Sequence, residues 1–281
     1  MATSSDTTIN VNLKLPTKWE DLDDKQLRYL FGLLAQNFPA QQVKTYCLFR
    51  WSGMQVMHRY GKGWWCKFAK DEFRTRNSGC ASAILNKFRL RSTCTEFVIM
   101  ADQINAAIAS LDWLDSLPSL PVRLAKIGSH HAIDAQFQGV PFETFIVCDN
   151  LYQGYLATKS DVLLEQMASH LYTPGNVRLQ DAERISIFYW FASLKAFFTK
   201  VFKHFFQPID NVSGDNGNMF EQQQSQFELL QNAVNAQIRA LTKGDITKEQ
   251  QVLSLDTWRA LTELDAQARE YEEINKQYPT K

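Results

Sequence analysis

Residues 181–206 read DAERISIFYWFASLKAFFTKVFKHFF and form the most apolar segment of this 281-residue chain. At 100° per residue the large apolar side chains share one broad arc, and the lysines occupy the rest of the circumference. This pattern predicts a helix from Asp181 to Phe206, which ends before Pro208. We favour burial of the arc in a protein core over an interfacial membrane helix, the alternative that lysines opposite aromatics allow. The arc consists of Ile187, Trp190, Phe191, Leu194, Phe197, Phe198, Val201, Phe202 and Phe205.

The segments before this helix also show helical spacing. Asp23 and Gln26 stand at capping-box positions and predict a helix over about residues 23–36, with apolar residues at i, i+3, i+4 and i+7. Pro39 predicts the start of a second helix, antiparallel to the first. Further helices are predicted over residues 96–117, from Pro141 onward, and over residues 161–171.

Two short segments alternate in the manner of strands. Trp64, Cys66 and Phe68 alternate with Trp65 and Lys67, which predicts a hairpin over residues 64–76 with its turn at residues 70–72. Residues 122–138 predict a second hairpin or loop pair. The predicted fold class is therefore mainly α with small β-hairpins (α+β).

The C-terminal region predicts an antiparallel helical hairpin. Residues 211–218, NVSGDNGN, have the composition of a linker, and heptad spacing follows from Phe220 onward. Gly244 is suited to end the first helix, and Thr247 to cap the second. The predicted organisation is a disordered lead (1–12), a mixed, mostly helical domain (13–210), a linker (211–219) and a helical hairpin (220–281).

Composition restricts the class of protein. The net charge is zero and aromatic residues make up 12% of the chain, so we expect thick cores or large partner surfaces. Five cysteines without a CxxC pair argue against a disulfide framework or a four-cysteine zinc site. The polar first ten residues lack the pattern of a signal peptide, and a cytoplasmic location is expected.

No catalytic motif is present. Gly61-Lys62-Gly63 lacks the spacing of a phosphate-binding loop, and neither HExxH nor GxSxG occurs. His130 and His131 would point to opposite sides of a strand, which makes them poor joint metal ligands. Cys148 beside Asp149 allows a thiol nucleophile, although an apolar helix favours a buried, inert cysteine. We therefore predict no catalytic residue, cofactor or metal.

A basic and aromatic stretch lies between Arg59 and Arg91. It holds nine lysines and arginines against Asp71 and Glu72, a net charge of +7. Phosphate-pairing charges interleaved with stacking rings are typical of proteins that bind single-stranded nucleic acid. The competing interpretation is a hairpin whose rings enter the core. The candidate nucleic-acid residues are Arg59, Lys62, Trp64, Trp65, Lys67, Arg74, Arg76, Arg89 and Arg91.

Both ends of the chain resemble a known group of proteins. Residues 15–20 (LPTKWE) through 48–51 (LFRW), and residues 256–264 (DTWRALTEL), are similar to uncharacterised proteins encoded in prophages of anaerobic gut bacteria. The likeness covers about a quarter of the chain. It implies a role in building or assembling a phage particle, and thus a location in the host cytoplasm or in the particle.

The leading hypothesis is a non-enzymatic structural, assembly or adaptor protein that acts through helical protein–protein interfaces. Its C-terminal hairpin would bind a protein partner or a second copy. The alternative is a nucleic-acid-binding accessory protein that uses residues 59–91; an enzyme of unfamiliar type and a membrane-surface protein are further hypotheses. The predicted partner-binding residues are Phe220, Phe227, Val234, Leu241, Trp258, Leu261, Leu264 and Tyr271.

Overall fold

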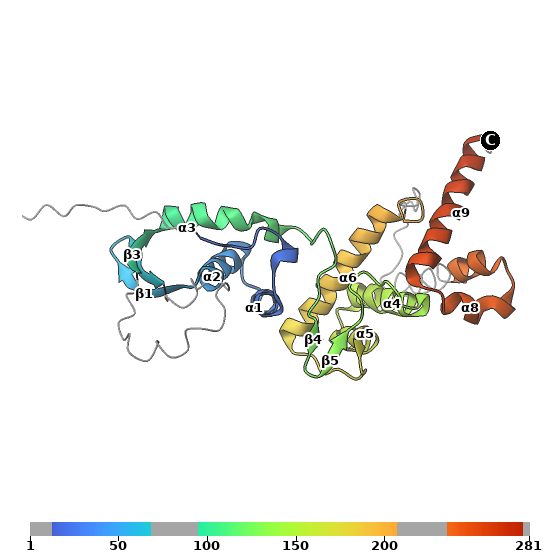
Figure 1. Ribbon diagram of the computed structural model, residues 1–281, viewed down its shortest axis with the longest axis horizontal. Coiled ribbons are helices and arrows are strands. Elements are labelled where there is room, and N and C mark those ends of the chain that lie inside the picture. The colour runs from blue at the N-terminus through green and yellow to red at the C-terminus, as the bar shows by residue number, and fades with distance from the viewer. Residues whose placement is uncertain (1–12, 69–94, 207–234, 278–281) are drawn as a thin grey trace, which may run out of the picture. The chain divides into compact units, whose positions relative to one another are not determined.

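A computed structural model describes residues 13–68, 95–206 and 235–277, which form two compact units (Figure 1). The N-terminal unit comprises Met1–Leu22 and Gln36–Ser116, and the C-terminal unit comprises Asp23–Ala35 and Leu117–Lys281. The division therefore differs from the predicted domains, because residues 117–206 and 235–277 share one unit. The predicted lead and linker lie outside the described residues.

The N-terminal unit is built on an antiparallel sheet of strand order β1-β2-β3. Strands β1 and β2 form a hairpin whose turn includes Gly61 at φ +58, a conformation that glycine adopts without strain. Helix α2 begins after Pro39, as predicted, and ends at Gly53, which also has a positive φ. The elements are η1 (Trp19–Asp21), α2 (Ala40–Ser52), β1 (Met54–Tyr60), β2 (Gly63–Phe68), β3 (Thr95–Met100), α3 (Ala101–Ile108) and η4 (Ala109–Asp115).

Two sequence predictions for this unit need correction. Strand β2 lies within the predicted hairpin, but it pairs with β1 before it and with β3 after it. The predicted turn at residues 70–72 lies outside the described residues. Residues 95–100, predicted in part as helix, form β3 because they complete the open edge of β2, and the helix begins only at Ala101.

The C-terminal unit is organised around α6, most of whose predicted apolar arc is buried. The helix ends at Val201, which is exposed, and not at Phe206 as predicted. Helices α1 and α5 pack against α6, and α4 packs against α5 (Figure 1). Trp190, Phe191 and Phe198 are buried, and their rings contact Phe137 and Phe145. The elements are α1 (Asp24–Ala35), β4 (Lys126–Ile127), β5 (His130–Ala132), α4 (Phe142–Thr158), α5 (Asp161–Leu171), β6 (Tyr172–Thr173), α6 (Asp181–Val201), η5 (Ile246–Lys248), α8 (Glu249–Leu253) and α9 (Thr257–Gln277).

The predicted fold class is confirmed. Among the described residues the chain is mainly helical, with two small antiparallel three-stranded sheets, β1-β2-β3 and β4-β5-β6. The β4–β5 hairpin lies within the segment predicted for it. Helices α4 and α5 also begin where the sequence predicts, after Pro141 and at Asp161.

Helix α1 has the predicted start and packs within the C-terminal unit. The Gln26 backbone N–H donates to the Asp23 carboxylate at 2.8 Å, and the Asp23 N–H donates to the Gln26 side chain at 3.0 Å, which completes the capping box. However, α1 belongs to the C-terminal unit and packs along α6, whereas α2 belongs to the N-terminal unit. Within its unit, α1 therefore has α6 as its packing partner.

The C-terminal helices follow the predicted boundaries only in part. Residues 235–242 are helical and end near Gly244 at φ +81, as predicted. The second helix is interrupted, because Leu255 accepts a hydrogen bond from the Phe142 N–H at 2.8 Å and Asp256 bridges to Pro141. These contacts hold the chain extended at the start of α4. The interruption divides the predicted second helix into a short helix, α8, and a long helix, α9.

Candidate interaction surfaces

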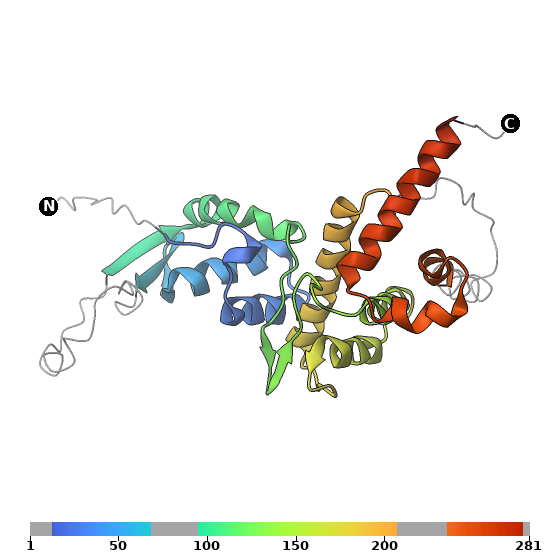
Figure 2. The ribbon, with the colours of Figure 1, turned by 45° about the vertical axis from the view of Figure 1, so that its right-hand side comes forward.

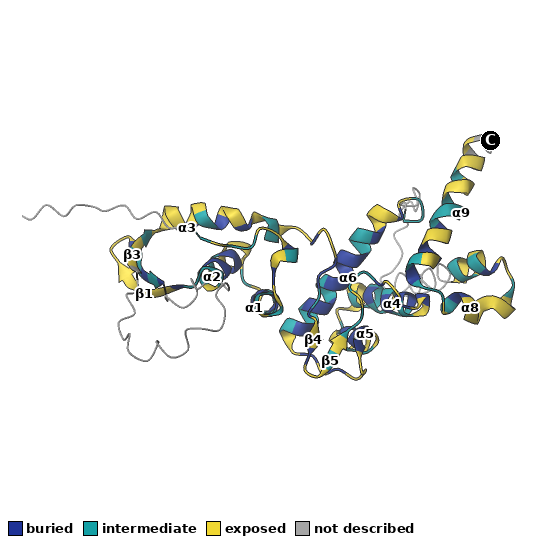
Figure 3. Cartoon of the chain, viewed as in Figure 1, coloured by how far each residue is buried: buried dark blue, intermediate teal, exposed yellow. Residues whose placement is uncertain are grey.

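The predicted partner-binding residues differ widely in exposure. Leu261 and Leu264 of α9 are buried, Trp258 and Leu241 are half-buried, and Tyr271 is 67% exposed. Phe220, Phe227 and Val234 lie outside the described residues. The stripe of α9 is thus divided: its first turns belong to the core of the C-terminal unit, and its last turns remain accessible (Figure 3).

Several contacts fix the first half of α9. The Thr257 hydroxyl donates to the Val140 carbonyl at 2.8 Å, and the Trp258 indole N–H donates to the Gln136 carbonyl at 2.7 Å. The Trp258 ring packs edge-on against three phenylalanine rings at the end of α6. The Asp265 carboxylate accepts the backbone N–H groups of His204 at 2.8 Å and Phe205 at 3.0 Å. The rings around Trp258 are Phe197, Phe198 and Phe202.

The second half of α9, residues 266–277, extends beyond helices α4 and α8 of the same unit (Figure 2). Tyr271 is 67% exposed and Ile274 is 56% exposed. They stand three residues apart and therefore lie on one side of the helix. We call residues 266–277 the distal half of α9.

The candidate nucleic-acid residues lie on both faces of the β1-β2-β3 sheet. Trp64 faces α2 and α3, together with the buried Cys66 and Phe68, whereas Trp65 and Lys67 face the opposite side. The competing interpretation, in which the rings of the hairpin enter the core, therefore holds for Phe68, which is buried. Arg59 pairs with Trp64 across the strands, and Lys62 lies in the turn. Arg74, Arg76, Arg89 and Arg91 lie outside the described residues.

A bulge in β1 decides which of its side chains join Trp65. The register shifts between Val56 and His58, so Met57 is the extra residue and His58 lies opposite Trp65. Tyr60 then falls on the same face as His58. Sequence reasoning missed His58 because a bulge leaves no local signal in an otherwise regular run.

On this outer face the aromatic rings are in contact. His58 stacks on Trp65 with ring centroids 5.9 Å apart and planes 9° apart, and Tyr60 meets Trp65 edge-on at 5.7 Å. The Trp65 indole N–H donates to the Glu96 carboxylate at 3.2 Å. We call this surface the ring platform. Its residues are His58, Tyr60, Trp65, Lys67, Val98 and Met100.

An apolar groove lies on the inner side of the same sheet. It has a volume of about 320 Å³ and is bordered by Phe49 of α2, Trp64 of β2 and Ile104 of α3. Asn105 also lines it and accepts a hydrogen bond from the Gln41 side chain at 3.2 Å. The groove is lined by side chains from the sheet and from α2 and α3.

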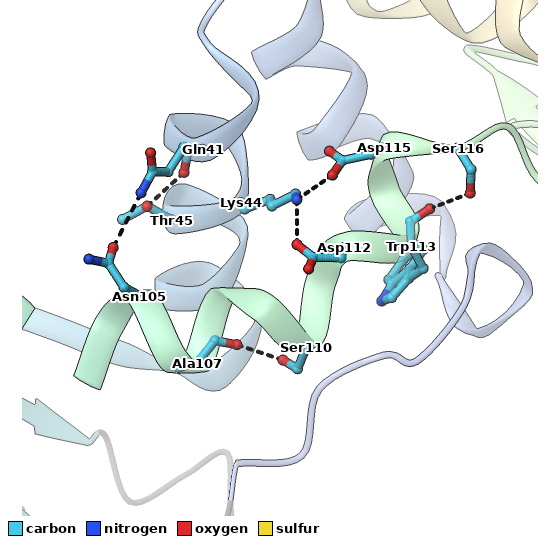
Figure 4. Close-up of polar contacts among 10 residues, drawn as sticks. All are labelled: Gln41, Lys44, Thr45, Asn105, Ala107, Ser110, Asp112, Trp113, Asp115 and Ser116. Atoms are coloured by element: carbon cyan, nitrogen blue, oxygen red, sulfur yellow. Dashed lines mark hydrogen bonds and ion pairs between the residues drawn. The ribbon is translucent and has the colours of Figure 1, made fainter. Parts of the chain in front are cut away.

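Lys44 joins α2 to η4 (Figure 4). Its ammonium donates to the carboxylates of Asp112 and Asp115, each at 2.6 Å, and its side chain is only 10% exposed. Burial lowers the pKa of Lys44, but the hydrogen bonds to both carboxylates outweigh burial and leave the pKa above its ordinary value. The charged form is thus favoured by folding.

Replacing Lys44 tests this junction. Lys44→Met keeps most of the apolar stem and removes the two charge-assisted hydrogen bonds, so we expect the N-terminal unit to lose about 1–3 kcal/mol at pH 7. Because the folded-state pKa is raised, the contribution is complete below the ordinary value of 10.5 and is lost as the pH rises through the raised pKa.

Urea denaturation of wild type and Lys44→Met at neutral and at high pH measures this difference in unfolding free energy. Lys62→Met, in the exposed β1–β2 turn, is the matched control and should change stability by no more than about 0.5 kcal/mol. A difference between wild type and Lys44→Met that stays constant above pH 10.5 would contradict the assignment.

The cysteines that the structure describes are buried. Burial raises the pKa of Cys47 to about 12, and burial together with the nearby Asp149 charge raises that of Cys148. The thiolate needed for nucleophilic attack is disfavoured at both positions. The Asp149 carboxylate accepts from the Lys195 ammonium at 2.7 Å. Cys148 is thus the buried cysteine that its apolar helix predicts.

Within residues 13–68, 95–206 and 235–277, no three His, Cys, Asp or Glu side chains are grouped as a metal site would require. In the same ranges, no helix has both the length and the apolarity that crossing a bilayer demands. The apolar arc of α6, the candidate for an interfacial helix, is instead largely buried in the core.

A scan against protein-family models, a search of curated proteins and a search of solved structures each returned no match to this chain.

Proposed function

We propose that this protein is a non-enzymatic adaptor or assembly protein that binds a protein partner through the distal half of α9. The carrying observation is that the apolar stripe of α9 is buried in the core at Leu261 and Leu264 and is exposed at Tyr271, next to which Ile274 adds a second exposed apolar side chain. An amphipathic helix of this kind presents its apolar residues to a groove on a partner at i and i+3 spacing.

The anchoring supports binding because it fixes the direction of the helix before a partner arrives. Trp258 and Asp265 hold the base of α9, and Glu272 lies 3.3 Å from the His204 ring nitrogen, which ties the helix to the segment after α6. A preformed helix has less conformational entropy to lose on binding. Tyrosine is also enriched among the residues that dominate interface energies.

Charge indicates the chemistry of the partner. In the distal half of α9 three glutamates stand against Arg269 and Lys276, a net charge of −1, and Glu270 and Glu272 flank Tyr271. An apolar groove with a basic rim would complement this surface. The resemblance of residues 256–264, the base of this helix, to prophage-encoded proteins is our reason for placing the partner in a phage particle, and the protein in that particle or its host's cytoplasm.

Photo-crosslinking tests the proposal in cells that produce the particle. Benzoylphenylalanine in place of Ile274 should form an adduct with one structural protein of the particle, identified by mass spectrometry. The same label in place of Val162, which is exposed on α5, is the control. No adduct from position 274, an identical adduct from position 162, or an adduct between two copies of this chain would each reject the proposed partner.

Substitution then measures the contribution of the stripe. We expect Tyr271→Ala/Ile274→Ala to weaken partner binding by about tenfold to a hundredfold, since truncating interface anchors commonly costs more than about 1 kcal/mol each. Alanine preserves helix propensity, so the fold should be unchanged. Titration calorimetry with the crosslinked partner gives the affinities. Tyr60→Ala, an exposed tyrosine of the N-terminal unit, is the matched control and should bind as the wild type does.

A further inference from the structure

We propose that the ring platform of the N-terminal unit binds single-stranded nucleic acid, with bases stacking on the His58, Trp65 and Tyr60 rings. This site is separate from the distal half of α9 and does not depend on the proposed adaptor function. Sheets that carry two or three aromatic rings on an open face bind unpaired bases in this way.

The rings are arranged for stacking. His58 and Trp65 are nearly parallel, with planes 9° apart, so they begin a stack that a planar base can continue. Tyr60 stands edge-on to Trp65 and is 57% exposed. Base–aromatic stacking tolerates any sequence because every base has a π-face. The platform therefore suits unpaired bases of either DNA or RNA.

The backbone holds these rings in place. The bulge at Met57 brings His58 and Tyr60 to one face, and the hydrogen bond to Glu96 fixes the Trp65 indole. A Cβ at Gly63 would meet the Met100 sulfur at 2.7 Å and the Ile99 carbonyl oxygen at 2.6 Å. Glycine there lets Met100 lie over the sheet, and Met100 borders the rings with Val98.

Charge favours a polyanion over a neutral partner surface. Lys62 in the β1–β2 turn and Lys67 on the platform stand against Glu96, which lies opposite Lys67, a net charge of +1. Arg59 pairs with Trp64 and belongs to the other face. Lys67 follows Trp65 by two residues and so shares its face. An ammonium beside a stacked base can pair with the adjoining phosphate.

Fluorescence anisotropy of the full-length chain provides the test. The probes are labelled oligothymidylate and oligouridylate of about 20 nucleotides, longer than the roughly 4–16 nucleotides that an OB-fold covers. At about 50 mM salt we expect binding of one or both probes, and weaker binding as salt rises. Preference between the two probes distinguishes DNA from RNA within the same chemistry.

The substitutions assign the site. Trp65→Ala and Tyr60→Ala should each weaken binding by about tenfold to a hundredfold, and Trp65→Phe, which keeps a ring, should restore most of it. Lys67→Gln should reduce the slope of log affinity against log salt by about 0.7. Tyr271→Ala is the matched control, because this exposed tyrosine lies on α9, and it should bind as the wild type does. Far-UV circular dichroism checks that each variant is folded.

Four results would overturn the proposal. They are no binding of either probe at low salt, equal affinity for duplex DNA of the same length, unchanged affinity in both Trp65→Ala and Tyr60→Ala, and an equal loss in Tyr271→Ala. Loss of calorimetric binding to the protein partner of α9 in Tyr60→Ala, with no effect on the oligonucleotides, would assign the platform to a protein surface instead.

Discussion

Phe31→Ala is expected to destabilise the C-terminal unit by about 3–5 kcal/mol, the usual cost of truncating a buried phenylalanine to alanine. Phe31 is fully buried, and its ring lies 5.6 Å from that of Tyr189 on α6. The neighbouring Leu30 is also buried. Removing the ring leaves a cavity between α1 and α6, and the surrounding helices relax only in part.

Phe31→Ala should act on the C-terminal unit, to which α1 belongs. Helix α1 precedes the whole N-terminal sheet in sequence, yet its polar contacts are to the C-terminal unit. Arg28 pairs with Glu183 and donates to the Lys126 carbonyl at 2.7 Å, and the Asp24 carboxylate accepts the Ala125 N–H at 3.0 Å. Phe31→Ala should therefore loosen segments that lie more than 90 residues away in sequence, and not α2, which follows α1 directly in the chain.

Hydrogen exchange by mass spectrometry shows whether Phe31→Ala loosens the C-terminal unit or α2, because it reports local opening peptide by peptide. We expect faster exchange in peptides from α1 and α6, and unchanged exchange in peptides from α2 and β1. Lys25→Ala, exposed on the same helix, is the control and should change stability by no more than about 0.5 kcal/mol. Faster exchange confined to α2 and β1 would show that α1 belongs to the other unit.

Local signals account for what the sequence predicted correctly. The capping pair Asp23 and Gln26, and the prolines before α2 and α4, act within one turn of the helix they start. The apolar arc of α6 is likewise a property of one contiguous segment. Such features require no knowledge of which other segment lies nearby, and the mainly helical fold class followed from them.

The strands and the neighbour of α1 depend on non-local contacts. In β1 only Met54 is buried, so no alternation marks the strand. Residues 95–100 form a strand because they pair with the free edge of β2. The sequence of these residues does not indicate that such an edge lies nearby. In the same way, the stripe of α1 predicts that some core covers it but not that the cover is α6.

In the candidate sites, too, some features follow from local sequence signals and others depend on non-local contacts. Alternation along β2 predicts that Trp64 and Trp65 face opposite sides, and the structure places them so. Which of the two faces carries further rings depends on the bulge at Met57, and the sequence contains no signal for it. For α9, heptad spacing identified an apolar stripe, but periodicity does not reveal whether that stripe is covered by the chain itself or by a partner.

Leu261→Ala separates these two roles of α9, and we expect it to lower the unfolding free energy of the C-terminal unit by about 2–5 kcal/mol. Leu261 is fully buried, as is Ala260 beside it, and α9 packs against α4. Trp258 is held by the Gln136 carbonyl one turn earlier. If residues 220–281 were instead a separate hairpin reserved for a partner, the same change would weaken partner binding and leave the stability of α4 and α6 intact.

Urea denaturation gives the change in unfolding free energy, and hydrogen exchange of α4 and α6 peptides gives its location. Tyr271→Ala is the matched control, because it removes an apolar side chain from the same stripe at a position that is 67% exposed, and it should shift stability by no more than about 0.5 kcal/mol. Equal stability of Leu261→Ala and wild type would reject the anchored base of α9. The expected contrast, a large loss at Leu261 and none at Tyr271, would locate the boundary between core and interface within three turns of one helix, because a turn holds about 3.6 residues.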